Sequence, residues 1–155
     1  MNTSTRLSII FLLISGSSQL LSQNIIRDIK VYHDSGSPLQ IREYEETENR
    51  VELKRIIQLY LNGKKKKEHH YSGGTLNGQT STWYPNGQRK TLLHYTNGKR
   101  DGIWRMWYNN GIKWKEGYHK DGKKEGTWVS WSYDGKKVEE ELYQDGKLAE
   151  KKKFD

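Results

Sequence analysis

The chain has 155 residues, of which 32% are hydrophobic and 30% are charged, and its formal net charge is +8. This apolar fraction is too small to fill a two-layer core, whereas six Trp and ten Tyr exclude a disordered chain, because such chains are poor in aromatic residues. The absence of cysteine excludes a disulfide framework and lipidation at a mature N-terminal cysteine.

Residues 1–23 have the layout of a secretory signal peptide. Arg6 precedes a short apolar run, Leu7 to Ser15, which is followed by small and polar residues. The run is shorter than the ~20 residues that a transmembrane helix needs. We therefore expect export to the periplasm, the outer envelope or the medium, with a mature N-terminus between about residues 18 and 24. An uncleaved anchor that extends to Leu21 is the alternative.

Residues 24–51 form an N-terminal segment that is compatible with a degenerate first repeat. Tyr32 to Gly36 could form a turn, and the run from Gln40 to Tyr44 could form a strand. The spacing between Gly36 and Gly63 does not fit the period of the rest of the chain.

Residues 52–155 form a repeat domain with a period of 24 residues. Glycines of one phase are Gly63, Gly87, Gly111 and Gly135, and the tryptophans of another are Trp83, Trp107 and Trp131. Self-similarity at a fixed short period indicates stacked supersecondary units.

Each repeat is predicted to be a β-hairpin. Asn110-Gly111 separates two runs of aromatic and β-branched residues, which favours a two-residue type I′ turn. Counting outward from that turn pairs Trp107 with Trp114, Arg105 with Glu116, and Ile103 with Tyr118. In the next repeat the same count pairs Trp131 with Val138. A second, looser set of turns at Asn97-Gly98 and its equivalents would link the hairpins. The predicted fold is all-β, an elongated single-layer antiparallel β-meander of stacked 24-residue hairpins.

The tryptophans are the candidate binding residues. The predicted pairing places Trp107, Trp114 and Trp131 on one face of the sheet, and Trp104 and Trp128 on the other. We expect each ring to keep an edge in water, because a single-layer sheet is wet on both sides. Our hypothesis is that the Trp107 face binds the partner, since its aromatic residues are denser. The alternative is that these rings are structural.

The distribution of charge and histidine bears on the partner and on catalysis. Lysines crowd into the turns and would form two basic fringes, which suit a protein or an anionic envelope or membrane surface. We expect no nucleic-acid partner. His70 and His94 lie one repeat apart, about 10 Å in the stacking direction, which is too far for one zinc ion. No catalytic motif occurs, so we expect neither enzymatic activity nor a metal or cofactor.

The repeat units resemble the bacterial variant of the MORN (membrane occupation and recognition nexus) repeat. Gly102-Ile-Trp-Arg-Met-Trp-Tyr-Asn-Asn-Gly111 and its equivalents at 78–87 and 126–135 carry the resemblance. It implies hairpins stacked into an elongated twisted sheet that acts as a binding scaffold. Bacterial chains of this variant are often labelled YwqK-type antitoxins, which implies an antitoxin or immunity protein as an alternative. A third hypothesis is carbohydrate binding through the Trp faces.

Overall fold

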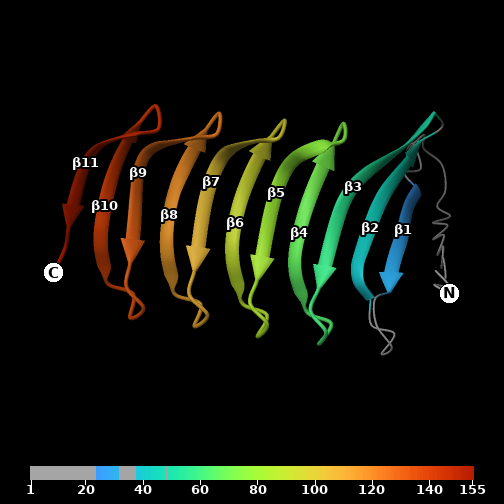
Figure 1. The fold of residues 1–155 in the computed structure, drawn as a ribbon, viewed down its shortest axis with the longest axis horizontal. Helices are drawn as coiled ribbons and strands as arrows, with labels where there is room; N and C mark the ends of the chain where they lie inside the picture. Colours follow the sequence, from blue (N-terminus) through green and yellow to red (C-terminus); the bar gives the residue numbers. More distant parts are fainter. Residues whose placement is uncertain (1–23, 32–37, 48) are drawn as a thin grey trace, which may run out of the picture.

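The chain folds into one open antiparallel sheet in which every strand pairs with its neighbours in sequence (Figure 1). The computed structural model describes residues 24–31, 38–47 and 49–155. The strands are β1 (Asn24–Val31), β2 (Pro38–Thr47), β3 (Arg50–Leu59), β4 (Lys65–Ser72), β5 (Thr75–Trp83), β6 (Arg89–Thr96), β7 (Lys99–Trp107), β8 (Lys113–Lys120), β9 (Lys123–Trp131), β10 (Lys137–Gln144) and β11 (Lys147–Lys153). The predicted single-layer meander is therefore confirmed.

The two sets of turns are the reverse of the prediction. The loop around Asn110-Gly111 holds three residues, because the Tyr108 N–H donates to the carbonyl of Ile112 and the Gly111 N–H donates to that of Tyr108. Only Gly111, with φ +87°, has a positive φ in this loop. This is a type I turn followed by a glycine bulge. The connection that has a positive φ at two successive residues, as type I′ requires, is the one at Asn97 (φ 49°) and Gly98.

This loop geometry changes the register next to it. Trp107 pairs with Lys113 and not with Trp114, because the pairing shifts by one residue between Met106 and Trp107. In the next repeat Trp131 pairs with Lys137 and not with Val138. Both predicted pairs are wrong for the same reason, because the three-residue loop sets each tryptophan opposite the lysine two residues after the glycine. An extra residue in the strand that follows, Trp114 or Val138, then restores the predicted register. Farther from the loop the prediction is right, because Ile103 pairs with Tyr118.

A thin apolar layer lies on the sheet. Among the described residues the buried hydrophobic side chains are Ile57, Leu92 and Trp128. Trp128 keeps 2% of its surface exposed, so the expectation that its ring has an edge in water is wrong. The ring lies flat over Gly117 on β8, because that residue has no side chain to hold it away.

The N-terminal strands continue the same sheet. β2 pairs with β1 on one side and with β3 on the other, so residues 24–31 and 38–47 are an extension of the repeat array. The predicted signal peptide and the predicted turn at Tyr32 to Gly36 lie outside the described residues. In the described part of the chain no helix is long and apolar enough to cross a membrane.

Candidate binding surfaces of the sheet

The connections between strands line two opposite edges. The loop edge, at the bottom of Figure 1, carries the three-residue loops and comprises residues 60–66, 84–90, 108–114 and 132–138. The turn edge, at the top, carries the tight turns and comprises residues 71–77, 95–101, 119–125 and 143–149. Equivalent positions on one edge are two strands apart, about 10 Å. Each edge is thus a row of similar groups at regular spacing.

Side-chain hydrogen bonds join successive loops of the loop edge. The Tyr84 hydroxyl donates to the carbonyl of Trp107 at 2.8 Å, and the Tyr108 hydroxyl donates to that of Trp131 at 2.9 Å. The Asn110 amide donates to the carbonyl of Tyr133 at 3.0 Å. Tyr60, Asn62 and Asn86 make the equivalent bonds one or two repeats earlier. These bonds hold the loops at a fixed separation.

The series of bonds ends in the last loop. Ser132 and Asp134 stand where the earlier repeats have Tyr and Asn, and the Ser132 hydroxyl donates to the carbonyl of Lys136 at 3.1 Å within the loop. The Asp134 carboxylate has no hydrogen to donate to a carbonyl, and the Ser132 side chain is much shorter than a tyrosine. The last loop therefore satisfies its own polar groups locally.

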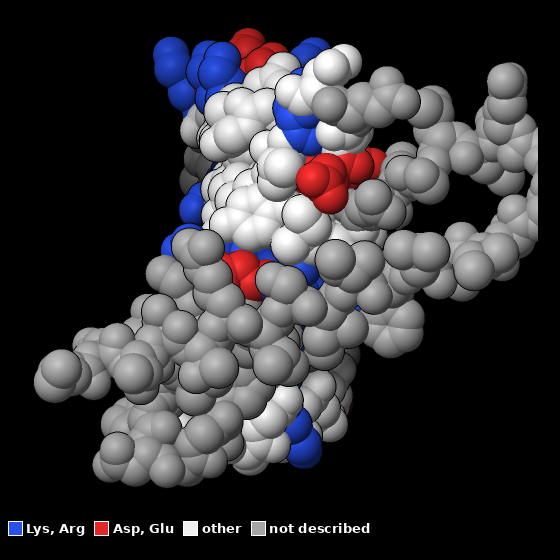
Figure 2. Space-filling model, turned by 90° about the vertical axis from the view of Figure 1, so that its right-hand side faces the viewer, with Lys and Arg blue, Asp and Glu red and all other residues white. Residues whose placement is uncertain are grey.

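The two edges differ in charge. The loop edge carries eight Lys and Arg residues and one acidic residue, Asp134. The turn edge carries six Lys and Arg residues and four acidic residues. Figure 2 views the molecule from the β1 end and shows basic and acidic atoms side by side at the top, where the turn edge lies. The predicted basic fringes therefore exist on both edges, but most of the net charge is on the loop edge.

A row of cation–π contacts crosses the Trp107 face. The Lys65 ammonium lies 5.4 Å from the ring centroid of Trp83, and the Lys113 ammonium lies 4.6 Å from that of Trp131. Each contact joins one repeat to the next and contributes about 0.5–1 kcal/mol where the pair is exposed. The lysine side chains thus cover part of the tryptophan rings, which a second layer would cover in a two-layer protein.

Carboxylates complete this row. Glu68 accepts a hydrogen bond of 2.7 Å from Lys65, and Glu116 accepts one of 3.1 Å from Lys113. Burial by itself would raise the pKa of Glu68, but the hydrogen bonds and charges of Lys65 and Arg55 outweigh it and lower that pKa. The pKa of Glu116 is lowered in the same way, against the effect of burial, by its basic neighbours.

The predicted site residues have different environments. Trp107 and Trp131 are half-buried on the Trp107 face. Trp114 is 42% exposed and lies against Tyr108 in the loop edge, with ring centroids 5.9 Å apart. Trp104 is half-buried on the opposite face, 5.0 Å from Trp128. The structure therefore does not gather the five tryptophans into one surface.

Trp128 belongs to the packing of the opposite face. His119 meets its ring edge-on at a centroid distance of 5.0 Å, and the Lys124 ammonium lies 4.6 Å from it. Burial, followed by the charges of Arg100 and Lys124, lowers the pKa of His119 below 6.5. Trp128 is thus structural, whereas Trp114 is accessible.

Tyr133 is an accessible aromatic residue that the sequence analysis did not select. It is 55% exposed, meets Tyr108 edge-on at 5.1 Å, and its hydroxyl donates to the Asn109 side chain at 3.0 Å. Its loop position has no aromatic residue in the preceding repeats, where Leu61, Pro85 and Asn109 stand, so periodicity gave no signal for it.

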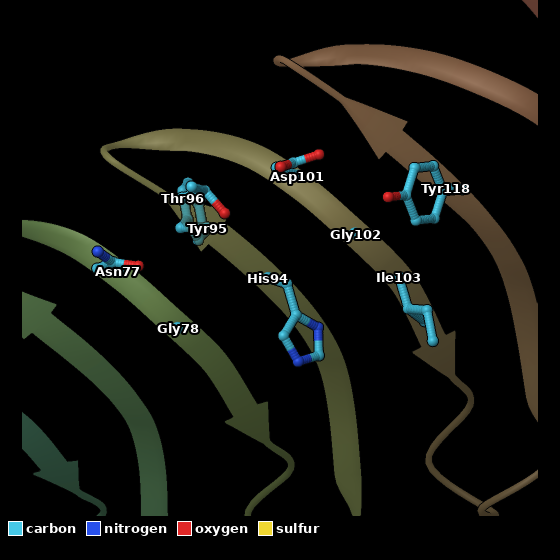
Figure 3. Close-up of a pocket in the computed structure, with 9 residues that line it drawn as sticks. All are labelled: Asn77, Gly78, His94, Tyr95, Thr96, Asp101, Gly102, Ile103 and Tyr118. Carbon is cyan, nitrogen blue, oxygen red and sulfur yellow. The ribbon is translucent and has the colours of Figure 1, made fainter.

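A shallow depression of about 390 Å³ lies near the turn edge (Figure 3). His94 on β6, Ile103 on β7 and Tyr118 on β8 form its floor on the Trp107 face. The other lining residues are Asn77, Gly78, Tyr95, Thr96, Asp101 and Gly102. Ile103 and Tyr118 are 39% and 45% exposed, so the floor is accessible.

Comparison with known proteins agrees with this architecture. The family model described as the MORN repeat variant matches residues 76–97, 100–122 and 124–145, which run from β5 to β10. Comparison with curated proteins finds no match. The strands outside the three matched repeats continue the same meander. The segment from β5 to β10 therefore consists of three repeats of the MORN repeat variant.

Proposed function

We propose that this protein is a non-enzymatic scaffold that binds an anionic surface, such as a membrane or another part of the cell envelope, through its loop edge. MORN repeats generally bind proteins or membranes, which makes a binding scaffold the expected role. The observation that carries the proposal is the charge of the loop edge, eight basic residues against one acidic residue. A cation near an anionic surface contributes about 1 kcal/mol to attraction.

Aromatic side chains on the same edge support this proposal. Trp114 and Tyr133 are accessible there, and the Lys66 and Lys90 ammonium groups lie 5.8 Å and 5.4 Å from tyrosine rings of the edge. Rings with a polar tip and lysines with a long apolar stem suit the boundary between water and an apolar phase. The hydrogen bonds between loops keep these groups in one line, so the whole edge can meet a flat surface.

A vesicle sedimentation assay tests the role of the edge. The purified protein is mixed at about 0.1 M salt, where the Debye length is about 10 Å, with vesicles of phosphatidylcholine alone or with added phosphatidylglycerol. We expect binding only to the anionic vesicles. Replacing Lys66, Lys90 and Lys136 by Gln should reduce the bound fraction severalfold.

The matched control removes three charges from the turn edge, with Lys99, Lys120 and Lys147 replaced by Gln. It should keep most of the binding, because acidic residues already offset the charge of that edge. Equal losses in the two triple variants would show that net charge and not the loop edge governs binding. Binding to neutral vesicles as strong as to anionic ones would refute the proposal.

We also propose that the protein is exported, as the layout of residues 1–23 indicates. Export would place the loop edge next to envelope surfaces. N-terminal sequencing after expression in a Gram-negative host should find a mature chain that starts between about residues 18 and 24. Cytosolic protein that retains Met1 would contradict export and would favour the antitoxin hypothesis.

A further inference from the structure

One repeat departs from the charge pattern of the Trp107 face. The basic position of each repeat is occupied by Lys65, Arg89, Lys113 and Lys137. The position three residues later is occupied by Glu68, Leu92, Glu116 and Glu140. Leucine thus replaces the carboxylate in one repeat of four, and the cation of that repeat is Arg89.

The three complete repeats show how a carboxylate is held on this face. In each, the glutamate accepts a hydrogen bond from the basic residue three positions earlier, and that cation lies over the aromatic ring of the next repeat. The last of them uses Phe154, whose centroid is 4.4 Å from the Lys137 ammonium. On this face each of these lysines is therefore held between a carboxylate and an aromatic ring.

The incomplete repeat has the cation and the ring but lacks the acid. The Arg89 guanidinium lies 6.0 Å from the ring centroid of Trp107. Arg89 is exposed, and within the described residues no carboxylate pairs with it. Three other arginines with side chains on this face are paired: Arg27 with Glu43, Arg55 with Glu43 and Glu68, and Arg105 with Glu116.

The surroundings of Arg89 favour an anionic ligand. Its cross-strand partner is Trp83, so the guanidinium lies between two tryptophan positions of the face. Leu92, which is 7% exposed, supplies an apolar floor, and its partner on β7 is Arg105. A guanidinium binds a carboxylate through two parallel hydrogen bonds and is favoured over lysine for that geometry. Tryptophan and arginine are also the residues most enriched at the centres of protein interfaces.

We propose that Arg89, Trp107 and Leu92 form a docking site for a glutamate or aspartate side chain of an acidic segment in a protein partner. The partner's carboxylate would pair with Arg89 above Leu92, as Glu68, Glu116 and Glu140 pair with the cations of the other repeats. Arg89 lies where the loop edge meets the Trp107 face, and the site adds Trp107 and Leu92 of that face. The triple variant at Lys66, Lys90 and Lys136 leaves all three of these residues unchanged, so this proposal and the one for the loop edge can fail separately.

The test is an NMR titration with a hexaglutamate peptide at about 0.15 M salt, where exposed charges farther apart than about 8 Å are largely screened. We expect the Nε–H signal of Arg89 and the indole signal of Trp107 to shift with added peptide, and hexaglutamine to leave both in place. Replacing Arg89 by Gln should raise the Kd about fivefold or more. The matched control is Lys99→Gln, which removes one charge from the turn edge, and it should change the Kd less than twofold.

A second variant supplies the missing acid within the chain. Leu92→Glu should abolish peptide binding, because its own carboxylate would pair with Arg89 as in the other repeats. Thermal melting shows whether this variant stays folded, and Arg89→Gln decides the question if it does not. The proposal is overturned if hexaglutamate leaves the two signals unmoved at millimolar concentration, or if the Lys99 variant loses as much affinity as the Arg89 variant. It is also overturned if Arg89→Gln weakens only the binding of anionic vesicles, which would assign the residue to a membrane contact.

Discussion

Replacing Gly117 by Ala should destabilise the sheet through a single contact. A Cβ at this position would lie 2.2 Å from Cδ2 and 2.4 Å from Cε2 of Trp128. Carbon atoms in contact are normally about 3.5–4.0 Å apart, so the ring would have to move by more than about 1 Å. The φ of Gly117 lies outside the left-handed region, so the backbone itself accepts alanine.

The magnitude follows from the burial of Trp128. A tryptophan buries about 150–250 Å², worth about 4–6 kcal/mol at ~25 cal/mol/Å², and the ring is 2% exposed here. Partial displacement of the ring should cost about 2–3 kcal/mol, in line with the 1–3 kcal/mol that overpacking commonly costs. For a chain of about 150 residues this lowers Tm by roughly 4–12 °C. Without the clash, alanine would stabilise by about 0.4–1 kcal/mol through the unfolded state, so the sign of the change tests the contact.

Thermal melts followed by circular dichroism measure the effect, and a double variant identifies its cause. When Trp128 is replaced by Leu, the ring is gone and Gly117→Ala should become neutral or stabilising, a coupling expected only for residues in contact. The reasoning fails if Gly117→Ala alone keeps or raises the wild-type Tm. It also fails if the cost of the alanine is the same with and without the Trp128 ring.

Three further predictions concern the loops and the response to pH. Gly111→Val should lower Tm by several degrees more than Ile112→Val, because a β-branched residue at φ +87° is strained, and equal melting points would contradict the loop geometry. Tyr108→Phe removes the hydrogen bond to the carbonyl of Trp131 and should cost about 1 kcal/mol in denaturant unfolding, and an unchanged midpoint would show that the bond adds no stability. Folding lowers the pKa of His119, so between that pKa and about 6.5 the imidazole is protonated in the unfolded chain but not in the folded one. The Tm should therefore fall from pH 7.5 to pH 5.5. A fall as large in His119→Gln would rule out this residue as a cause.

The turns show how far local sequence reasoning reaches. Asn-Gly and Asp-Gly occur on both edges, and both a type I′ turn and a type I turn with a glycine bulge accept them. The sequence therefore located the connections but assigned the two turn types the wrong way round. This error gave the wrong cross-strand partner only to residues beside the loop, such as Trp107, whose partner is Lys113. Pairs nearer the strand centres, such as Arg105 with Glu116, were predicted correctly.

The candidate site was less predictable than the fold. Trp104 and Trp128 were rightly placed on one face, but the sequence could not show that Gly117 lets one of these rings lie flat and buried. It also could not show that Trp114 projects at the loop edge, since that depends on the extra residue of the bulge. The sequence shows that Leu92 stands where other repeats have glutamate. Only the structure shows that Glu68 and Glu116 accept hydrogen bonds from the basic residue three positions earlier, so that Arg89 lacks the equivalent partner.

The sequence by itself determined the repeat, the all-β class, the order of the strands and the position of every connection in the repeat domain. It could do so because a short period makes each strand pair with its neighbours in sequence, so the pairing partners are local. Only the tertiary structure decided the exposure of each ring and the register of the residues beside the loops. These properties depend on side chains 11 to 24 residues apart that meet across strands, and a shift of one residue in register changes which of them meet.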